Sequence, residues 1–346
     1  MTQSVVDRVA IPIRHARRLP LILVASVLVL GIVTFLSITW GARSVNLGTI
    51  WRAFTDFDPA SASQTVIRQM RVPRTVLGVA AGAALGLSGA ILQGTTRNPL
   101  ADPGIMGINA GAAAAIVVGS AVVTAGSFGL STALAFVGAG AATLAVFAVA
   151  SLGREGATPV KLALAGAAVT AGLSSVTTAL VMTNVEALNE LRAWQVGSLA
   201  GRYANVVTAT LPFMVVGIVV ALGAGRALNG LALGEDTAHA LGQRIRLTRA
   251  VAFAIVAVLC GAATAACGPI AFVGLIVPHL ARIACGPDYR WILPFSAVLA
   301  PIVLLSADLV GRVAVAPGEL PVGVVLGVLG APAFIALVRS PRLKEL

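Results

Sequence analysis

The side chains that could do chemistry are few in this sequence, and their spacing is informative at one place. Asp308 and Arg312 are four residues apart within an apolar segment, a spacing that puts both side chains on one face of a helix. An ionisable residue inside a membrane segment suggests a functional role by default. Here an ion pair between the two side chains accounts for their presence, and we favour a structural role for it.

The other reactive residue types lack the spacing of a catalytic, nucleotide or metal site. No GxxxxGK[ST] phosphate loop occurs, and neither Lys161 nor Lys344 follows a glycine. No Cys-x-x-Cys or nucleophile pattern accompanies the cysteines and histidines, so we interpret the cysteines as apolar packing residues. These scattered residues are Cys260, Cys267, Cys285, His15, His239 and His279. We therefore expect a chain that is not an enzyme, with no metal site and no bound cofactor.

The composition predicts that these residues are positioned by membrane-spanning helices. Hydrophobic residues make up 58% of the 346 residues and charged residues only 11%, whereas soluble proteins carry about 25% charged residues. The apolar runs are continuous rather than alternating, which favours helices over a barrel. A bilayer core of ~30 Å requires about 20 residues per helix. Ten runs qualify: 19–40, 73–95, 105–124, 129–152, 160–182, 206–225, 249–267, 269–285, 291–311 and 320–339.

We therefore expect an all-α polytopic fold with one membrane domain, 19–339, between tails 1–18 and 340–346. An even number of spans puts both tails on one side. That side carries 16 basic residues against 8 on the other, so the positive-inside rule places both tails in the cytoplasm. The four arginines before the first run resemble the start of a signal peptide, but the run is long and indicates an uncleaved span. The arginines that give the net charge of +11 lie beside the spans and do not indicate nucleic-acid binding.

One polar island interrupts the apolar chain between the sixth and seventh spans. Residues 231–244 read LALGEDTAHALGQR, with Glu235 and Asp236 where acids favour a helix N-terminus. Gly234 is expected to break the preceding structure and Gly242 to end the helix. Leu233, Ala238 and Leu241 would form a small apolar face. Physical reasoning alone leaves two interpretations open, a helix that docks into a groove on a partner protein and an ordinary interfacial loop helix.

The second span carries small residues at every fourth position, which form one nearly smooth stripe along a helix. Such a stripe allows close helix packing in membranes, and a role in lining a transport path is the alternative. The stripe consists of Gly78, Gly82, Gly86, Ala90 and Gly94. The tenth span repeats the pattern with Gly323, Gly327 and Ala331.

Four ordered blocks of the sequence resemble one family. They are RVPRTVLGVAAGAALGLSGAILQGTTRNPLADPGIMGINAGA (71–112), LALGEDTAHALG (231–242), CGPIAFVGLIVPHLAR (267–282) and GRVAVAPGELPVGVVLGVLGAP (311–332). This combination resembles the FecCD, or BtuC-like, permeases, the membrane subunits of type II ABC importers for iron(III)-siderophores, haem and vitamin B12. The first and third blocks look most like a ferric-enterobactin permease. The resemblance covers about residues 45–340 and implies ten spans per subunit.

The resemblance also implies partners. A second permease subunit, identical or homologous, would complete the path in the bacterial inner membrane, among its lipids. Two ATP-binding subunits would supply ATP hydrolysis, with ATP and Mg on those chains, and an extracytoplasmic siderophore-binding protein would deliver the cargo. Importers of vitamin B12 or haem remain alternatives. From other classes, an ion-coupled secondary transporter and a structural scaffold also remain, although titratable groups within the spans are scarce for ion coupling.

Site residues follow from the resemblance. Segment 231–242 resembles the coupling helix that sits in a cleft of the ATPase, carried by Gly234, Glu235, Asp236, Thr237, Ala238, Leu241 and Gly242. Outer arginines at equivalent positions resemble sockets for acidic patches of the binding protein, here Arg71, Arg74 and Arg312. The cytoplasmic gate falls at 156–161, where Thr158 and Pro159 are the candidates. Segment 97–104, RNPLADPG, is expected either to brace the ATPase interface or to act as a rigid connector.

Overall fold

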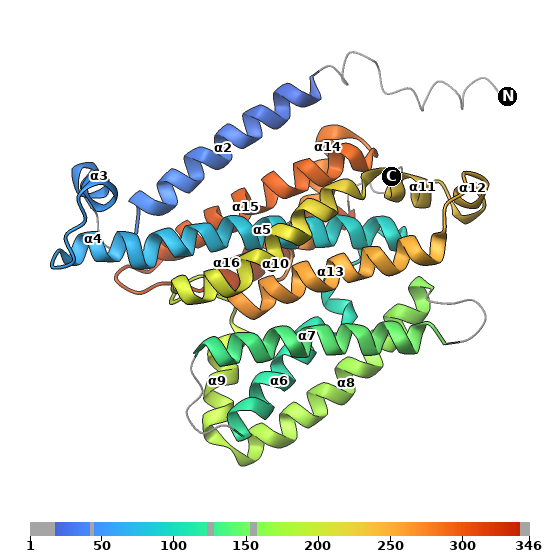
Figure 1. Cartoon of the computed structure of the whole chain (residues 1–346), viewed down its shortest axis with the longest axis horizontal. Coiled ribbons are helices and arrows are strands. Elements are labelled where there is room, and N and C mark those ends of the chain that lie inside the picture. Colours follow the sequence, from blue (N-terminus) through green and yellow to red (C-terminus); the bar gives the residue numbers. More distant parts are fainter. Residues whose placement is uncertain (1–17, 42–44, 123–127, 153–157, 340–346) are drawn as a thin grey trace.

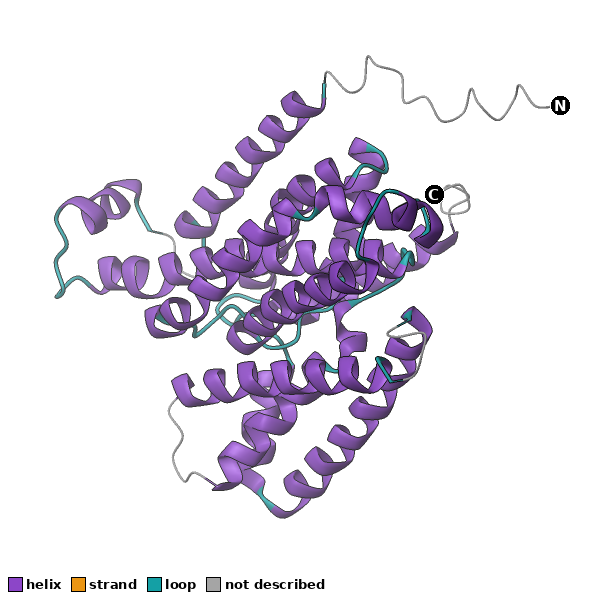
Figure 2. Ribbon diagram, turned by 45° about the vertical axis from the view of Figure 1, so that its right-hand side comes forward, coloured by secondary structure: helices purple, strands orange, loops and turns teal. Residues whose placement is uncertain are grey.

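A computed structural model of the chain describes residues 18–41, 45–122, 128–152 and 158–339. Every regular element in these ranges is helical, as expected from the sequence (Figure 2). The two predicted tails lie outside the described residues. Ten helices coincide with the ten predicted spans: α2 (Leu19–Thr39), α5 (Val72–Thr96), α6 (Ile108–Val122), α7 (Phe128–Ala150), α8 (Pro159–Thr183), α10 (Ala204–Gly223), α13 (Ile245–Cys267), α14 (Val273–Cys285), α15 (Tyr289–Ala314) and α16 (Val322–Arg339).

Short helices fill the connections between these ten. They are α3 (Leu47–Thr55), α4 (Ala62–Val66), a π-helical turn (Ile67–Arg71), a 3-10 turn (Pro103–Met106), α9 (Val185–Gln195), α11 (Gly225–Ala232) and α12 (Glu235–Ala240). Seven helices of the described chain are long and apolar enough to cross a bilayer by length and composition, and α6, α14 and α16 are shorter apolar helices. α14 has 13 residues and is therefore roughly 20 Å long, less than a full crossing.

The helices run between two ends of the molecule (Figure 1). One end, which we call the α12 end, holds α11, α12 and the start of α2. The opposite end, the α3 end, holds α3, α4 and α9.

Helix α5 is the central element of the larger helix group. It packs against α15, α13, α14, α10 and α2, and 20 of its 25 residues are buried. Its small residues make this possible, because each leaves room for a neighbouring backbone. A Cβ atom added at Gly82 would lie 2.6 Å from the Cα of Pro301, and one at Gly86 would lie 2.5 Å from the Cβ of Ala300. The predicted stripe therefore packs against α15.

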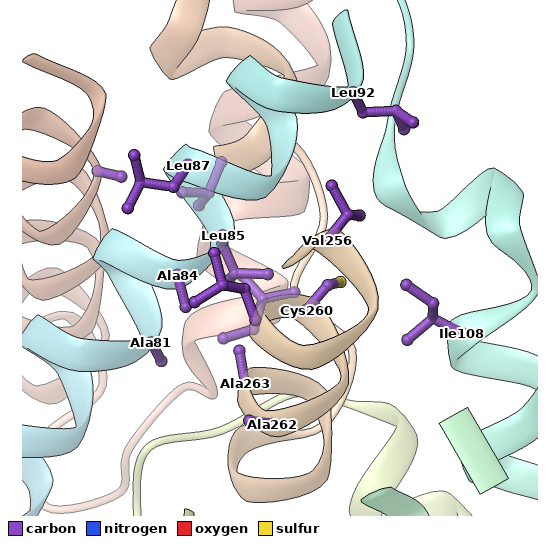
Figure 3. Packing of buried hydrophobic residues seen from close by; sticks show 14 of the residues in the cluster. Ala81, Ala84, Leu85, Leu87, Leu92, Ile108, Val256, Cys260, Ala262 and Ala263 are labelled. Atoms are coloured by element: carbon purple, nitrogen blue, oxygen red, sulfur yellow. The ribbon is translucent and has the colours of Figure 1, made fainter. Parts of the chain in front are cut away.

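Helices α6, α7, α8 and α9 form a second group on the other side of α13 (Figure 1). Glycines also form the crossing of α6 and α7, since a Cβ atom at Gly111 or at Gly138 would lie 2.3 Å from the other residue's carbonyl oxygen. In Figure 3, Val256 and Cys260 of α13 lie between Leu85 of α5 and Ile108 of α6. All four side chains are buried, so α13 joins the two groups through an apolar core.

The contact between α5 and α15 yields a stability prediction. In Gly82→Ala the new methyl group would meet the backbone of Pro301 and force the helices apart, and overpacking of this kind costs about 1–3 kcal/mol. We expect a lower midpoint of thermal unfolding for the purified protein in detergent. Gly31→Ala in α2 is the matched control, because nothing lies within 4 Å of the added atom. Equal midpoints for the two variants would contradict the packing role.

Candidate functional site

The polar segment between α10 and α13 forms two short helices at the α12 end (Figure 1). Gly234 precedes α12 with φ 107°, and Gly242 follows it with φ 77°. Both values lie in the region that side chains other than glycine rarely adopt. The predicted helix start and stop at these glycines are therefore confirmed, and Thr237 lies exposed between them.

The exposed surface of α12 differs from the predicted apolar face. Leu233 and Leu241 flank the helix, each 65% exposed, whereas Ala238 is fully buried. The prediction that Ala238 shares an outer apolar face with the two leucines is thus wrong, because α12 packs on α11 and α13 and the small side chain faces that contact. The outward surface combines two leucines with the exposed Asp236.

The two adjacent acids of α12 have different environments. Glu235 accepts a hydrogen bond from Arg249 Nη2 of α13 at 2.7 Å and lies 3.9 Å from Arg97 Nη2 at the end of α5. The hydrogen bond from Arg249 lowers the pKa of the Glu235 carboxyl group. Asp236 is exposed and has no ion pair within the described chain. Glu235 thus ties α12 to two central helices, while Asp236 is presented outward.

At the α3 end, a pocket of about 340 Å³ is lined by four arginines. Three of them, Arg71, Arg74 and Arg312, are those predicted to meet a binding protein, and we call the site the arginine pocket. The fourth, Arg202, follows the loop after α9 and is buried, with its Nε donating to the Ser198 carbonyl. Sequence reasoning missed Arg202, since an isolated arginine in a loop carries no signal of its own.

The predicted ion pair between Asp308 and Arg312 is present, and both residues are buried. A third partner completes it: Arg74 of α5 donates to Asp308 through Nη2 at 2.7 Å and Nε at 3.1 Å. Arg74 Nη1 also meets Glu319 at 2.6 Å. Arg312 Nη1 donates to the carbonyl of Ser37 in α2 at 2.7 Å. One carboxylate therefore joins α15 to α5 and, through Arg312, to α2.

Arg71 supports the end of α2 in a similar way. Its Nη1 donates to the carbonyls of Ile38 and Thr39 at 3.0 and 2.7 Å, groups that have no partner within a helix that ends there. Arg71 is 7% exposed and Arg312 is 2% exposed. Both guanidinium groups thus engage the protein as well as lining the pocket, and their predicted docking role stays a prediction.

The two predicted gate residues lie at the start of α8. Thr158 is the N-cap of α8, where its Oγ1 accepts from the Lys161 amide at 3.4 Å, and Pro159 is the first residue of that helix. The adjoining residues 153–157 lie outside the described chain, so the gate stays a prediction.

Asp102 of segment 97–104 accepts a hydrogen bond from the Gly104 amide and lines a small cavity together with Thr264. This half of the segment is a connector folded into the bundle.

Comparisons with known proteins agree with this architecture. Residues 28–340 match the model of the FecCD transport family. The chain is 46% identical over 312 residues to the ferric enterobactin transport system permease protein FepD of Escherichia coli strain K12, covering 90% of this chain and 93% of the relative. It is 40% identical to YfiZ of Bacillus subtilis strain 168, described as a probable siderophore transport system permease protein, covering 92% and 96% of the two chains.

A solved structure gives the same result for the fold. It is described as an inward-facing conformation of a metal-chelate type ABC transporter, and it superposes with a TM-score of 0.81 at 28% identity. The match covers 92% of this chain and 99% of the other. With the family model matching most of its length, this chain belongs to the FecCD transport family.

Proposed function

We propose that this chain is the membrane-spanning permease subunit of an ATP-driven importer of iron(III)-siderophore complexes. The observation that carries the proposal is α12, a glycine-bounded helix with an exposed acid at one end of a membrane bundle, in a sequence without a phosphate-binding loop. Such a helix suits docking to a separate ATPase. The siderophore cargo rests on the names of the relatives, a ferric enterobactin permease and a probable siderophore permease.

The partners follow from this role. A second permease, identical or homologous, would complete the translocation path, and two ATP-binding subunits carrying ATP and Mg would dock at the α12 end. A siderophore-binding protein would dock at the α3 end. In this arrangement the α12 end faces the cytoplasm of a bacterium, both termini are cytoplasmic, and the chain lies in the inner membrane. This chain itself is a transport subunit and not an enzyme.

The contacts of Glu235 support a mechanical role for α12. Because Glu235 is bonded to Arg249 of α13 and lies near Arg97 of α5, a displacement of α12 by closing ATPase subunits would pull on both helices. α5 and α13 are the most buried of the seven long apolar helices. Their displacement would therefore shift the helices that pack on them, and so open or close the path.

The arginine pocket supports docking of an acidic partner at the opposite end. Guanidinium groups match carboxylates through paired hydrogen bonds. Arg74 is already paired with Glu319, whose side chain is 33% exposed. A carboxylate of the binding protein would replace Glu319 as the partner of Arg74. Glu319 would pair with Arg74 only while the binding protein is absent.

The proposed coupling role predicts the effect of charge reversal on α12. The double variant Glu235→Lys and Asp236→Lys should uncouple ATP hydrolysis from uptake, because it breaks the tether to Arg249 and places cations on the docking surface. In reconstituted vesicles we expect at least a tenfold loss of uptake per ATP hydrolysed. Glu186→Lys, an exposed acid at the start of α9 near the other end, is the control. Unchanged uptake and ATPase assembly in the double variant would argue against the coupling role.

Docking at the arginine pocket predicts opposite effects from the two members of one ion pair. Arg74→Gln should weaken binding of the cognate binding protein about two- to fivefold, since exposed pairs contribute about 0.2–1 kcal/mol each. Glu319→Gln should strengthen it by a similar factor, because it removes the competing acid. Surface plasmon resonance on the assembled complex measures both, with Arg52→Gln on α3 as the charge control. Identical affinities in all three variants would remove Arg74 from the docking surface.

Cargo and energy source are tested together in vesicles that contain the complete complex, after every chain has been identified by mass spectrometry. We expect ATP-dependent accumulation of ⁵⁵Fe-enterobactin when the binding protein is present, and none without the ATPase subunits. Cobalamin and haem serve as competing cargoes. Uptake that survives loss of the ATPase but stops when the proton gradient collapses would favour a secondary transporter instead.

A further inference from the structure

A second cluster of arginines lies at the α12 end, and the function described above uses only the contact of one of them, Arg97, with Glu235. A cavity of about 180 Å³ opens where α5 and α14 end and α15 begins. Two guanidinium groups, those of Arg97 and Arg282, line it together with the polar side chains of Asn98 and Tyr289. We call it the α5–α14 cavity.

The charge of this cavity is unbalanced. No aspartate or glutamate is among its lining residues. The nearest carboxylate with a defined contact is Glu235, whose Oε1 lies 3.9 Å from Arg97 Nη2 and is bonded more closely to Arg249. Asp288 lies beside the cavity in the sequence, but its carboxylate accepts hydrogen bonds from the Asn229 side chain and the Arg290 amide. Neither bond involves an arginine side chain, so Asp288 keeps its charge but is not paired with the guanidinium groups of the cavity. Among the described residues, Arg97 has only the loose contact with Glu235 and Arg282 has no acidic partner, which leaves the cavity suited to an anion.

The guanidinium group of Arg282 has a buried nitrogen that needs a hydrogen-bond acceptor. Its Nη2 donates to Gln93 Oε1 at 2.7 Å and lies 3.5 Å from the Tyr289 hydroxyl. Gln93 is itself fixed, because its amide donates to the Leu275 carbonyl at 3.2 Å. Arg282 Nη1 is buried and has no hydrogen-bond partner among the residues that the structure describes. Buried polar groups are nearly always hydrogen-bonded in folded proteins, and a charged donor has the greatest need of an acceptor.

The arginine on the other side of the cavity is placed to respond to an anion. Arg97 ends α5 in a left-handed conformation, with φ 50° and ψ 36°, and about half of its side chain is exposed. Its guanidinium group lies between the cavity and α12. At 3.9 Å from Glu235 it makes only a loose ion pair, which an anion entering the cavity would replace with a shorter one.

From these contacts we propose that the α5–α14 cavity receives a carboxylate side chain of the ATPase subunit, held by Arg282 and Arg97. The inference rests on the proposed function and adds a second, electrostatic contact to the one made by α12. Ala232, just before α12, also lines the cavity, so the cavity and α12 share one surface. A guanidinium pair fits a planar carboxylate, and capture of Arg97 would remove one of the two cations around Glu235.

The test measures ATPase binding to the assembled permease in nanodiscs of neutral lipid. Arg282→Gln should weaken binding roughly tenfold or more, since loss of one partner of a desolvated charge pair has effects of that size. Arg97→Gln, which changes a half-exposed side chain, should weaken binding about two- to fivefold. They should also make the affinity less sensitive to salt. Arg226→Gln, an exposed arginine of α11 at the same end, is the matched control and should change the affinity less than twofold. Thermal midpoints of the permease alone identify variants that are misfolded.

The outcomes separate the two proposals. If wild-type permease fails to bind the ATPase, the proposed function is wrong. If it binds, but Arg282→Gln and Arg97→Gln behave like Arg226→Gln, only the cavity proposal is overturned.

If anionic lipid added to the nanodiscs weakens ATPase binding to the wild type but not to Arg282→Gln, a lipid phosphate competes with the ATPase carboxylate for the cavity. An unchanged affinity of Arg282→Gln in neutral lipid together with altered lipid binding would assign the cavity to lipid and overturn the inference. Because Arg97 is half exposed, its variant provides the test if Arg282→Gln does not fold.

Discussion

The close approach of α5 and α15 is the constraint on which both candidate sites depend. Glycines on α5 place its backbone against Pro301 and Ala300, and larger side chains would not fit. This register brings Arg74 opposite Asp308, a fully buried carboxylate that is also held by Arg312. Removing one partner of such a pair leaves a buried charge and typically costs about 3–5 kcal/mol. Helix packing and the buried ion network therefore stabilise the same arrangement.

The two ends of the molecule are joined by the same helix. α5 has 25 residues and is about 37 Å long. Arg74, in its first turn, lines the arginine pocket, and Arg97, which ends it, lies near α12 and the α5–α14 cavity. Because α5 is buried by helices on most of its sides, it moves only together with its neighbours. In the proposed function, the movement of an ATPase docked at the α12 end would thus reach the arginine pocket through a single packed element.

Much of this architecture could be predicted from the sequence because its signals are local. Continuous apolar runs mark all ten helices, glycines mark both ends of α12, and spacing alone pairs Asp308 with Arg312. The rest depends on contacts between distant segments. Arg74 and Asp308 are 234 residues apart in the sequence, and no local sequence pattern predicts their contact. Ala238 faces inward, and Asp102 folds into the bundle beside Thr264, because tertiary packing decides which side of a short helix or turn is covered.

The arginines at the α3 end show that ion pairs inside the protein affect how the number of basic residues on each side of the membrane is interpreted. A membrane chain is expected to carry few basic residues on its outer side, but the segment between the first two spans contains five arginines. In the structure, Arg71 satisfies carbonyls at the end of α2 and Arg74 shares Asp308 with Arg312. The charges of Arg74 and Arg312 are thus compensated by Asp308 and Glu319, whereas Arg52 and Arg68 are exposed. Ion pairs inside the protein therefore account for two of the arginines at the α3 end, and the excess of basic residues toward the α12 end supports its proposed cytoplasmic position.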